Sequence, residues 1–123
     1  MGGKSRERLI SLQSGQACFN VIKKMGYPTY KFDPISQIEK NIKKINPDVV
    51  FNCLHGKFGE DGEIQKVLEK LKIPYTHSGV KSSQNAMDKL KSKKIYFKNN
   101  IKSPNYKLVK KISDLDQNIS KFK

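Results

Sequence analysis

The segment DVVFNCLHG (residues 48–56) is nearly continuous in apolar residues and ends at a His-Gly pair. Such a run predicts a strand buried on both faces of a parallel sheet, because helices cover both sides of such a sheet. Amphipathic helical patterns flank it: residues 35–46 carry isoleucine every three or four positions, and residues 62–72 place Ile, Val and Leu on one helical face. The segment therefore predicts a core strand of an α/β fold.

The same alternation continues toward the N-terminus and beyond the second helix. Residues 28–34 and 73–76 are short strand candidates, and residues 10–27 have the spacing of a helix. This order predicts a doubly wound parallel sheet, whose ligands lie outside the carboxyl ends of the strands. The glycine pair at Gly2 and the His-Gly pair at His55 belong to that edge. The strand that should precede Gly2 is absent from the chain.

From about Ser82 the character of the sequence changes. Residues 82–101 predict a helix with a polar start and a basic continuation, residues 103–111 a strand, and residues 112–123 a helix with Ser113 as its N-cap. No core partner is visible for these elements. They read as the beginning of a second unit that is cut short.

Composition limits the functions to consider. A chain of 123 residues with 36% hydrophobic residues forms one compact domain, and no apolar run approaches the roughly 20 residues that span a bilayer. No signal peptide precedes the domain, so we expect a cytoplasmic protein without a membrane partner. Cys18 and Cys53 lack the spacing of a metal site or a disulfide framework and predict small core residues.

The net charge of +14, from 25 Lys and Arg against 11 Asp and Glu, would attract a polyanion. The lysines are scattered among Ile and Asn, and no RNP-like motif or GXXG loop accompanies them. We therefore expect no nucleic-acid partner. A basic α/β module that binds nucleic acid remains the alternative from a different functional class.

The opening loop carries the first candidate site. Gly2-Gly3 predicts a turn with positive φ, and Ser5 and Glu7 follow it directly before a helix. Backbone N–H groups at a helix N-terminus favour an anion, and a carboxylate beside them can bind an ammonium group, so the combination suits an amino acid. Alternatively, Glu7 only favours the helix N-terminus electrostatically, and Arg8 is solvated.

The second candidate site is the loop GKFGEDG after His55, whose three glycines allow close backbone approach to a ligand. His55 stands at the carboxyl end of the predicted core strand, where a ligand contact is expected. Glu60 and Asp61 could bind a metal or pair with Arg8. The more economical interpretation is that they cap the helix that begins near Gly62.

Three motifs resemble the N-terminal region of D-alanine–D-alanine ligases, members of the ATP-grasp superfamily. They are GGKSRERLISLQSG (residues 2–15), LHGKFGEDGEIQKVLEKLKIPYTHSGV (residues 54–80) and NAMDKLKSK (residues 85–93), in the family's order and spacing. The resemblance covers residues 1 to 95. It implies a Rossmann-like (pre-ATP-grasp) parallel sheet domain over residues 1–86, without its first strand, and the truncated start of an ATP-grasp domain over residues 87–123.

The resemblance also implies an activity. Such ligases join two D-alanines for peptidoglycan synthesis: ATP phosphorylates the first D-alanine, and the amine of the second attacks the acyl phosphate. Carried over, Glu7 is a catalytic residue that holds the ammonium group of the first D-alanine. Ile10 and His55 are substrate-binding residues in the same pocket, and Lys89 contacts ATP. A related ligase with another acceptor, such as D-lactate, is the second alternative.

Cofactors and assembly follow from the same resemblance. We expect ATP with Mg²⁺ or Mn²⁺, with metal ligands outside this chain, and a homodimer in the complete enzyme. Two positions depart from the family's pattern: Leu9 replaces a frequent acidic residue, and His77 replaces a glycine in the loop after the last predicted strand. We further expect an N-terminal fragment that is inactive by itself.

Overall fold

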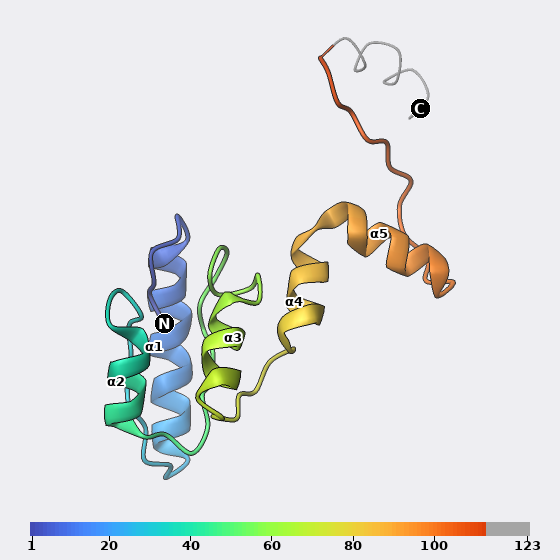
Figure 1. Cartoon of the computed structure of the whole chain (residues 1–123). Helices are drawn as coiled ribbons and strands as arrows, with labels where there is room; N and C mark the ends of the chain where they lie inside the picture. The colour runs from blue at the N-terminus through green and yellow to red at the C-terminus, as the bar shows by residue number, and fades with distance from the viewer. Residues whose placement is uncertain (113–123) are drawn as a thin grey trace. The chain divides into compact units, whose positions relative to one another are not determined.

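The computed structural model describes residues 1–112 (Figure 1). The chain divides into two compact units, Met1–Ser92 and Lys93–Lys123. The helices of the described residues are α1 (Arg8–Lys24), α2 (Ile38–Ile45), α3 (Glu63–Lys70), α4 (Val80–Met87) and α5 (Lys89–Lys98).

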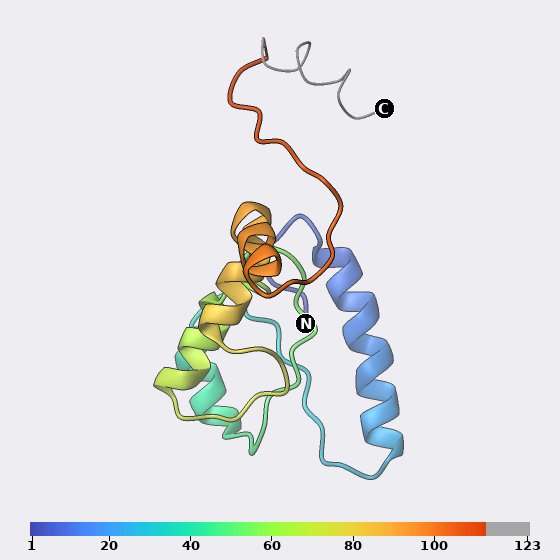
Figure 2. The same ribbon diagram turned by 90° about the vertical axis from the view of Figure 1, so that its right-hand side faces the viewer.

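The first unit has three layers. Extended segments around residues 28–34 and 48–56 run through its middle, with α1 on one side and α2 and α3 on the other (Figure 2). One parallel bridge, between Val50 and Tyr75, joins the segment at residues 48–56 to a third extended segment at residues 73–76. This is the layering that the predicted helix–strand alternation requires.

The predicted parallel sheet is not found among residues 1–112, where the bridge at Val50 is the only β pairing. The reason lies in the kind of contact that holds the longer extended segments. The N-terminal ammonium group of Met1 donates to the carbonyl of Phe32 (3.0 Å), and the Ser11 hydroxyl joins the Gly2 N–H to the carbonyl of Cys53. These contacts use a terminal ammonium group and a side-chain hydroxyl, and not the successive backbone hydrogen bonds of a ladder.

The hydrophobic core lies on the side of α2 and α3. Its buried side chains come from the helical faces predicted at residues 35–46 and 62–72 and from the end of the predicted core strand. Ile35 is the exception, because it is exposed and α2 begins three residues later. The buried core residues are Ile42, Leu54, Ile64 and Leu68, with Phe32, Ile38, Val50, Phe58, Val67, Leu71, Ile73 and Tyr75 packed against them.

Helix α1 is covered much less. Of its residues only Ser11 and Gly15 are fully buried, and Met1 packs so close to Gly15 that any side chain there would collide with it. The predicted apolar face of this helix is therefore only partly used: Leu12 and Ile22 are half-buried, whereas Ala17, Val21 and Met25 are exposed.

The second unit contributes little to a core. The strand predicted at residues 103–111 is wrong, because residues 103–110 have no regular structure. Side chains that such a strand would bury, including Tyr106 and Leu108, are exposed. The helix predicted at residues 112–123, with Ser113 as its cap, lies outside the described residues. The domain boundary expected between residues 86 and 87 stays a prediction.

Candidate functional site

The Gly2-Gly3 turn is held by contacts within the protein. Both glycines have positive φ, +87° and +78°, as predicted for this pair. The Gly2 N–H donates to the Ser11 hydroxyl (2.7 Å), and the Gly3 N–H donates to the Asp33 carboxylate (2.8 Å). These two N–H groups are therefore engaged in hydrogen bonds within the fold.

Ser5 connects this turn to the end of the predicted core strand. Its hydroxyl donates to the His55 carbonyl (2.8 Å) and accepts from the Glu7 N–H (3.2 Å). A Cβ on Gly56 would lie 2.9 Å from a carboxylate oxygen of Glu7, and Gly56 has φ +69°. The Glu7 carboxylate therefore lies against the Gly56 backbone, where an added side chain would force the carboxylate to shift.

Three side chains of the α1 N-terminus face the same way, because Glu7, Ile10 and Ser14 are three and four positions apart. The Ser14 hydroxyl lies 3.0 Å from Nε2 of His55 and donates to the carbonyl of Ile10. Ile10 is 55% exposed. The structure thus brings the predicted residues Glu7, Ile10 and His55 to one side of the molecule.

The His55 ring sits between a hydroxyl and a carboxylate. The Ser14 hydroxyl lies 3.0 Å from Nε2 of His55, and the tautomer of the ring sets which of the two donates. On the other side, Nδ1 lies 3.6 Å from a carboxylate oxygen of Glu60. The second oxygen of Glu60 accepts the Gly56 N–H (2.8 Å). The His55 side chain is 35% exposed, so part of its surface stays open to solvent.

The acidic pair of the GEDG loop has structural roles. Asp61 accepts from the N–H groups of Phe58 (2.8 Å) and Glu63 (3.1 Å) and so caps the start of α3. Neither Glu60 nor Asp61 pairs with Arg8. Within residues 1–112 no group of three His, Cys, Asp or Glu side chains could hold a metal ion.

Arg8 pairs with Asp33, a residue that the sequence reasoning did not single out. The two guanidinium nitrogens lie 3.1 and 2.6 Å from the two carboxylate oxygens. The hydrogen bond from Arg8 holds the pKa of Asp33 below its usual range. The available signal was the position of Asp33 at the carboxyl end of a predicted strand. The sequence reasoning also missed Ser14, for which the available signal was the helical spacing from Glu7 and Ile10.

Lys89 is not brought to the other predicted site residues by any contact. It is the first residue of α5 and is exposed. No hydrogen bond or ion pair in the described part of the chain joins it to Glu7, Ile10 or His55.

His77 stands where the resemblance predicts a reshaped loop. Its ring packs on Tyr75, with 4.6 Å between the ring centres, and Nε2 lies 3.4 Å from the side-chain nitrogen of Asn52. Burial lowers the pKa of His77. The imidazole therefore packs within the fold as a neutral ring at physiological pH.

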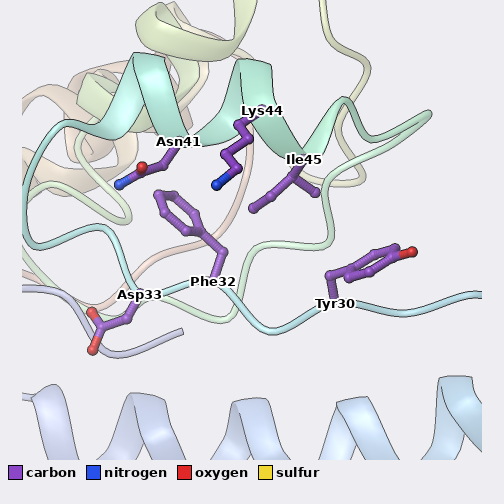
Figure 3. Close-up of a pocket in the computed structure, with 6 residues that line it drawn as sticks. All are labelled: Tyr30, Phe32, Asp33, Asn41, Lys44 and Ile45. Atoms are coloured by element: carbon purple, nitrogen blue, oxygen red, sulfur yellow. The ribbon is translucent and has the colours of Figure 1, made fainter.

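An open pocket of about 610 Å³ lies between the extended segment and α2, apart from Glu7 and His55. Figure 3 shows Phe32 pointing toward α2, between Asn41 and Lys44. Tyr30, Asp33 and Ile45 complete its lining. None of the predicted site residues belongs to it.

Comparison with known proteins identifies relatives of the N-terminal part of the chain. Residues 29–78 match the family model for the D-ala D-ala ligase N-terminus. The chain is 54% identical over 105 residues to a D-alanine–D-alanine ligase of Pelagibacter ubique, and 53% identical over 95 residues to D-alanine–D-alanine ligase B of Brucella suis. These alignments cover 85% and 77% of this chain but 34% and 31% of the relatives.

Solved structures agree with the sequence relatives. A crystal structure of D-alanine–D-alanine ligase from Bacillus anthracis is 33% identical, with a TM-score of 0.76 over 95% of this chain and 40% of that one. The same enzyme complexed with ATP is 34% identical, with a TM-score of 0.72 over 95% of this chain and 42% of that one. The chain thus spans about a third of the length of its sequence relatives.

Proposed function

Because the N-terminal part of this chain is homologous to the N-terminal part of D-alanine–D-alanine ligases, we propose that it supplies one wall of a D-alanine site in an ATP-dependent ligase. The reaction joins two D-alanines through an acyl phosphate, for peptidoglycan synthesis. The observation that carries the proposal is the Glu7 carboxylate. It lies against Gly56 on the same side as His55 and Ile10, and no group of residues 1–112 binds it.

The chemistry of this wall suits a small zwitterion. A carboxylate without a protein partner offers a charge-assisted hydrogen bond to an ammonium group. Ile10 supplies an exposed apolar surface against which the methyl group of D-alanine can pack. His55 supplies a polar ring that lies between Ser14 and Glu60. In this proposal Glu7 binds the amine of the first D-alanine, while Ile10 and His55 bound its pocket.

ATP would supply the phosphoryl group that activates the first carboxylate. Lys89 suits a phosphate contact, because its ammonium group is exposed and has no ion-pair partner in the part of the chain that the structure describes. The ATP complex of the Bacillus anthracis ligase supports the use of ATP. Mg²⁺, a homodimeric assembly and a cytoplasmic location belong to the same proposal. None of the helices within residues 1–112 is long and apolar enough to cross a membrane.

We also propose that the extended segments are strands of a Rossmann-like parallel sheet. The parallel bridge between Val50 and Tyr75 supports one pairing of such a sheet. The position of Met1 and Gly2, between the carbonyls of Phe32 and Cys53, marks where an apolar strand would pair with both neighbours. Exposed apolar side chains on the extended segments, Tyr30 and Phe51 among them, support this arrangement.

A chimera tests the proposed activity. The part of this chain that aligns with the Pelagibacter ubique relative would replace the matching 105-residue stretch of that ligase, and D-alanyl-D-alanine formation from ATP would be measured. We expect turnover comparable with that of the intact relative. The relative without the stretch serves as the inactive control, and the 123-residue chain alone is expected to release no D-alanine-dependent phosphate. A chimera that melts cooperatively but forms no dipeptide would contradict the proposal.

A further inference from the structure

We propose that the ion pair between Arg8 and Asp33 positions Glu7, so that both residues act on D-alanine binding without touching D-alanine. The inference rests on the proposed function of Glu7 and adds two positioning residues to it.

Arg8 and Asp33 together satisfy both polar groups of Gly3. The Arg8 Nη1 atom donates to the Gly3 carbonyl (2.8 Å) and to Oδ1 of Asp33 (3.1 Å), while Nη2 donates to Oδ2 (2.6 Å). The Gly3 N–H donates to the same Oδ1 atom (2.8 Å). The pair and the Gly3 backbone therefore form a closed set of hydrogen bonds in which each member orients the others.

The turn needs such a hold because side chains, and not the backbone of a helix or strand, bind its Gly2 N–H and both polar groups of Gly3. Gly2 and Gly3 follow one another at positive φ, a conformation that costs glycine much of its backbone freedom. The Asp33 carboxylate fills the space beside Gly2, where a Cβ would lie 2.6 Å from Oδ1. The Asp33 carboxylate therefore packs closely against Gly2 and also accepts a hydrogen bond from Gly3.

Holding the turn also holds Glu7. Arg8 is the first residue of α1, and Glu7 is the residue before it, without a side-chain cap. The loop from Gly3 to Arg8 is attached at two points: Gly3 through the Arg8–Asp33 pair, and Ser5 through the His55 carbonyl. Glu7 lies between Ser5, which is bound to the His55 carbonyl, and Arg8, which carries the ion pair. Loss of the pair releases the Arg8 side chain and the Gly3 backbone, so that Glu7 keeps only its N–H bond to Ser5 and the bond from the Ser11 N–H to its carbonyl (3.0 Å).

The pair is better suited to setting a geometry than to adding stability. Its side chains are 37% and 29% exposed, and ion pairs at such positions contribute little to folding. A guanidinium bound to a carboxylate through two parallel hydrogen bonds nevertheless defines direction strongly. We therefore expect its removal to affect substrate binding more than the melting temperature.

Arg8→Gln and Asp33→Asn in the chimera test the inference. Each should raise KM for D-alanine about tenfold, since small displacements of a binding group are costly, and leave KM for ATP unchanged. The double variant should be no worse than either single variant, because both remove the same unit. Arg8→Lys should have a KM for D-alanine between those of the native chimera and Arg8→Gln. Arg6→Lys, at an exposed neighbouring position, is the matched control and should have native kinetics.

Nuclear magnetic resonance on the 123-residue chain separates this inference from the proposed function. Arg8→Gln and Asp33→Asn should accelerate exchange of the Gly3 amide and shift the Glu7 carboxyl resonance, whereas Arg6→Lys should not. If the native chimera is inactive, the proposed function fails and these two signals alone decide the inference. If Arg8→Gln does not fold, Arg8→Lys takes its place. Unchanged signals, or an unchanged KM for D-alanine in an active chimera, would overturn it.

Discussion

At the scale of single residues, the site depends on how closely side chains approach glycine backbone. The Glu7 carboxylate reaches its position because Gly56 has no side chain, and Asp33 reaches its position because Gly2 has none. Ser5 and Ser14 then connect the helix start to both ends of His55, its carbonyl and its ring. Small residues therefore create the space, and polar side chains occupy it.

Replacement of the Glu7 carboxylate tests its proposed bond to an ammonium group. In the chimera, Glu7→Gln should lower kcat/KM for D-alanine by roughly 10- to 100-fold, the equivalent of about 1.5–3 kcal/mol for a charge-assisted hydrogen bond. KM for ATP should change little. Glu63→Gln, which removes an exposed α3 carboxylate paired with Lys66, is the control. Native D-alanine kinetics in Glu7→Gln would leave Glu7 with a role only at the helix start.

Two glycines with positive φ separate backbone strain from the clash with Glu7. Gly56→Ala and Gly26→Ala both place a side chain at positive φ, +69° and +89°, and each should lower the free energy of unfolding by about 1 kcal/mol. Only Gly56→Ala also collides with the Glu7 carboxylate, because Gly26 has no atom within 4 Å of the added Cβ. Urea unfolding of both variants, with D-alanine kinetics in the chimera, should show lost binding for Gly56→Ala alone.

At the scale of elements, helix α1 is attached to the rest of the first unit by polar contacts more than by apolar ones. The fully buried Ser11 hydroxyl accepts from the Gly2 N–H and donates to the Cys53 carbonyl (2.6 Å). Cys53 also contacts Cys18 of α1. Burial is the larger cause, and this contact the next, of the rise in the pKa of the Cys53 thiol to about 11. Specific hydrogen bonds thus fix the start of α1, and the candidate site residues of this helix lie at that start.

Ser11→Ala should loosen this attachment. The change leaves a buried N–H and a buried carbonyl without their partner, which costs about 1–3 kcal/mol. Chemical denaturation of the 123-residue chain should show the loss. Ser36→Ala, at an exposed position, should unfold like the native chain. Equal stability of the two variants would mean that α1 is held by other contacts.

The Arg8–Asp33 pair makes the attachment dependent on pH. The pKa of Asp33 is lowered in the folded chain, so the pair's contribution to stability is complete above the unfolded value near 3.8 and is lost as the pH falls through the folded value. The difference in free energy of unfolding between native chain and Asp33→Asn should be constant near neutral pH and shrink below that unfolded value. Denaturation curves measured across the acid range check this; a difference that grows on acidification would contradict it.

At the scale of the whole molecule, the first unit is unevenly packed. The core is formed by α2, α3 and one face of the extended segments, while Val49 and Phe51 of the predicted core strand are exposed. Exposed apolar side chains on a segment of this kind mark a face that another element covers. The place between Phe32 and Cys53, next to Met1 and Gly2, is where such an element would pair.

Addition of an apolar segment of about six residues ahead of Met1 tests this arrangement, since that is the length of an average strand. We expect a higher melting temperature, with about 4–8 °C for each kcal/mol gained in a unit of this size. A Gly-Ser segment of equal length is the control. If the chain already melts cooperatively and the apolar extension leaves its midpoint unchanged, the proposed sheet is wrong.

The sequence alone determined the elements whose causes are local. The isoleucine spacing of α2 and the Ile64–Leu68 face of α3 predict their buried sides, because helical periodicity depends on neighbours three and four positions away. The Gly2-Gly3 turn was predicted for a similar reason, since positive φ is a property of single residues. The ordered motifs also identified the homology that the relatives confirm.

Only the tertiary structure decided which distant groups meet. The partner of Arg8 is Asp33, 25 positions away, and not the acidic pair of the GEDG loop, which the sequence analysis gave as a possible partner. The Ser14–His55 contact joins a helix to a strand end that lies 41 positions later. A hydrogen bond depends on distance in space, and that distance is set by the packing of α1 against the extended segments, for which sequence periodicity holds no information.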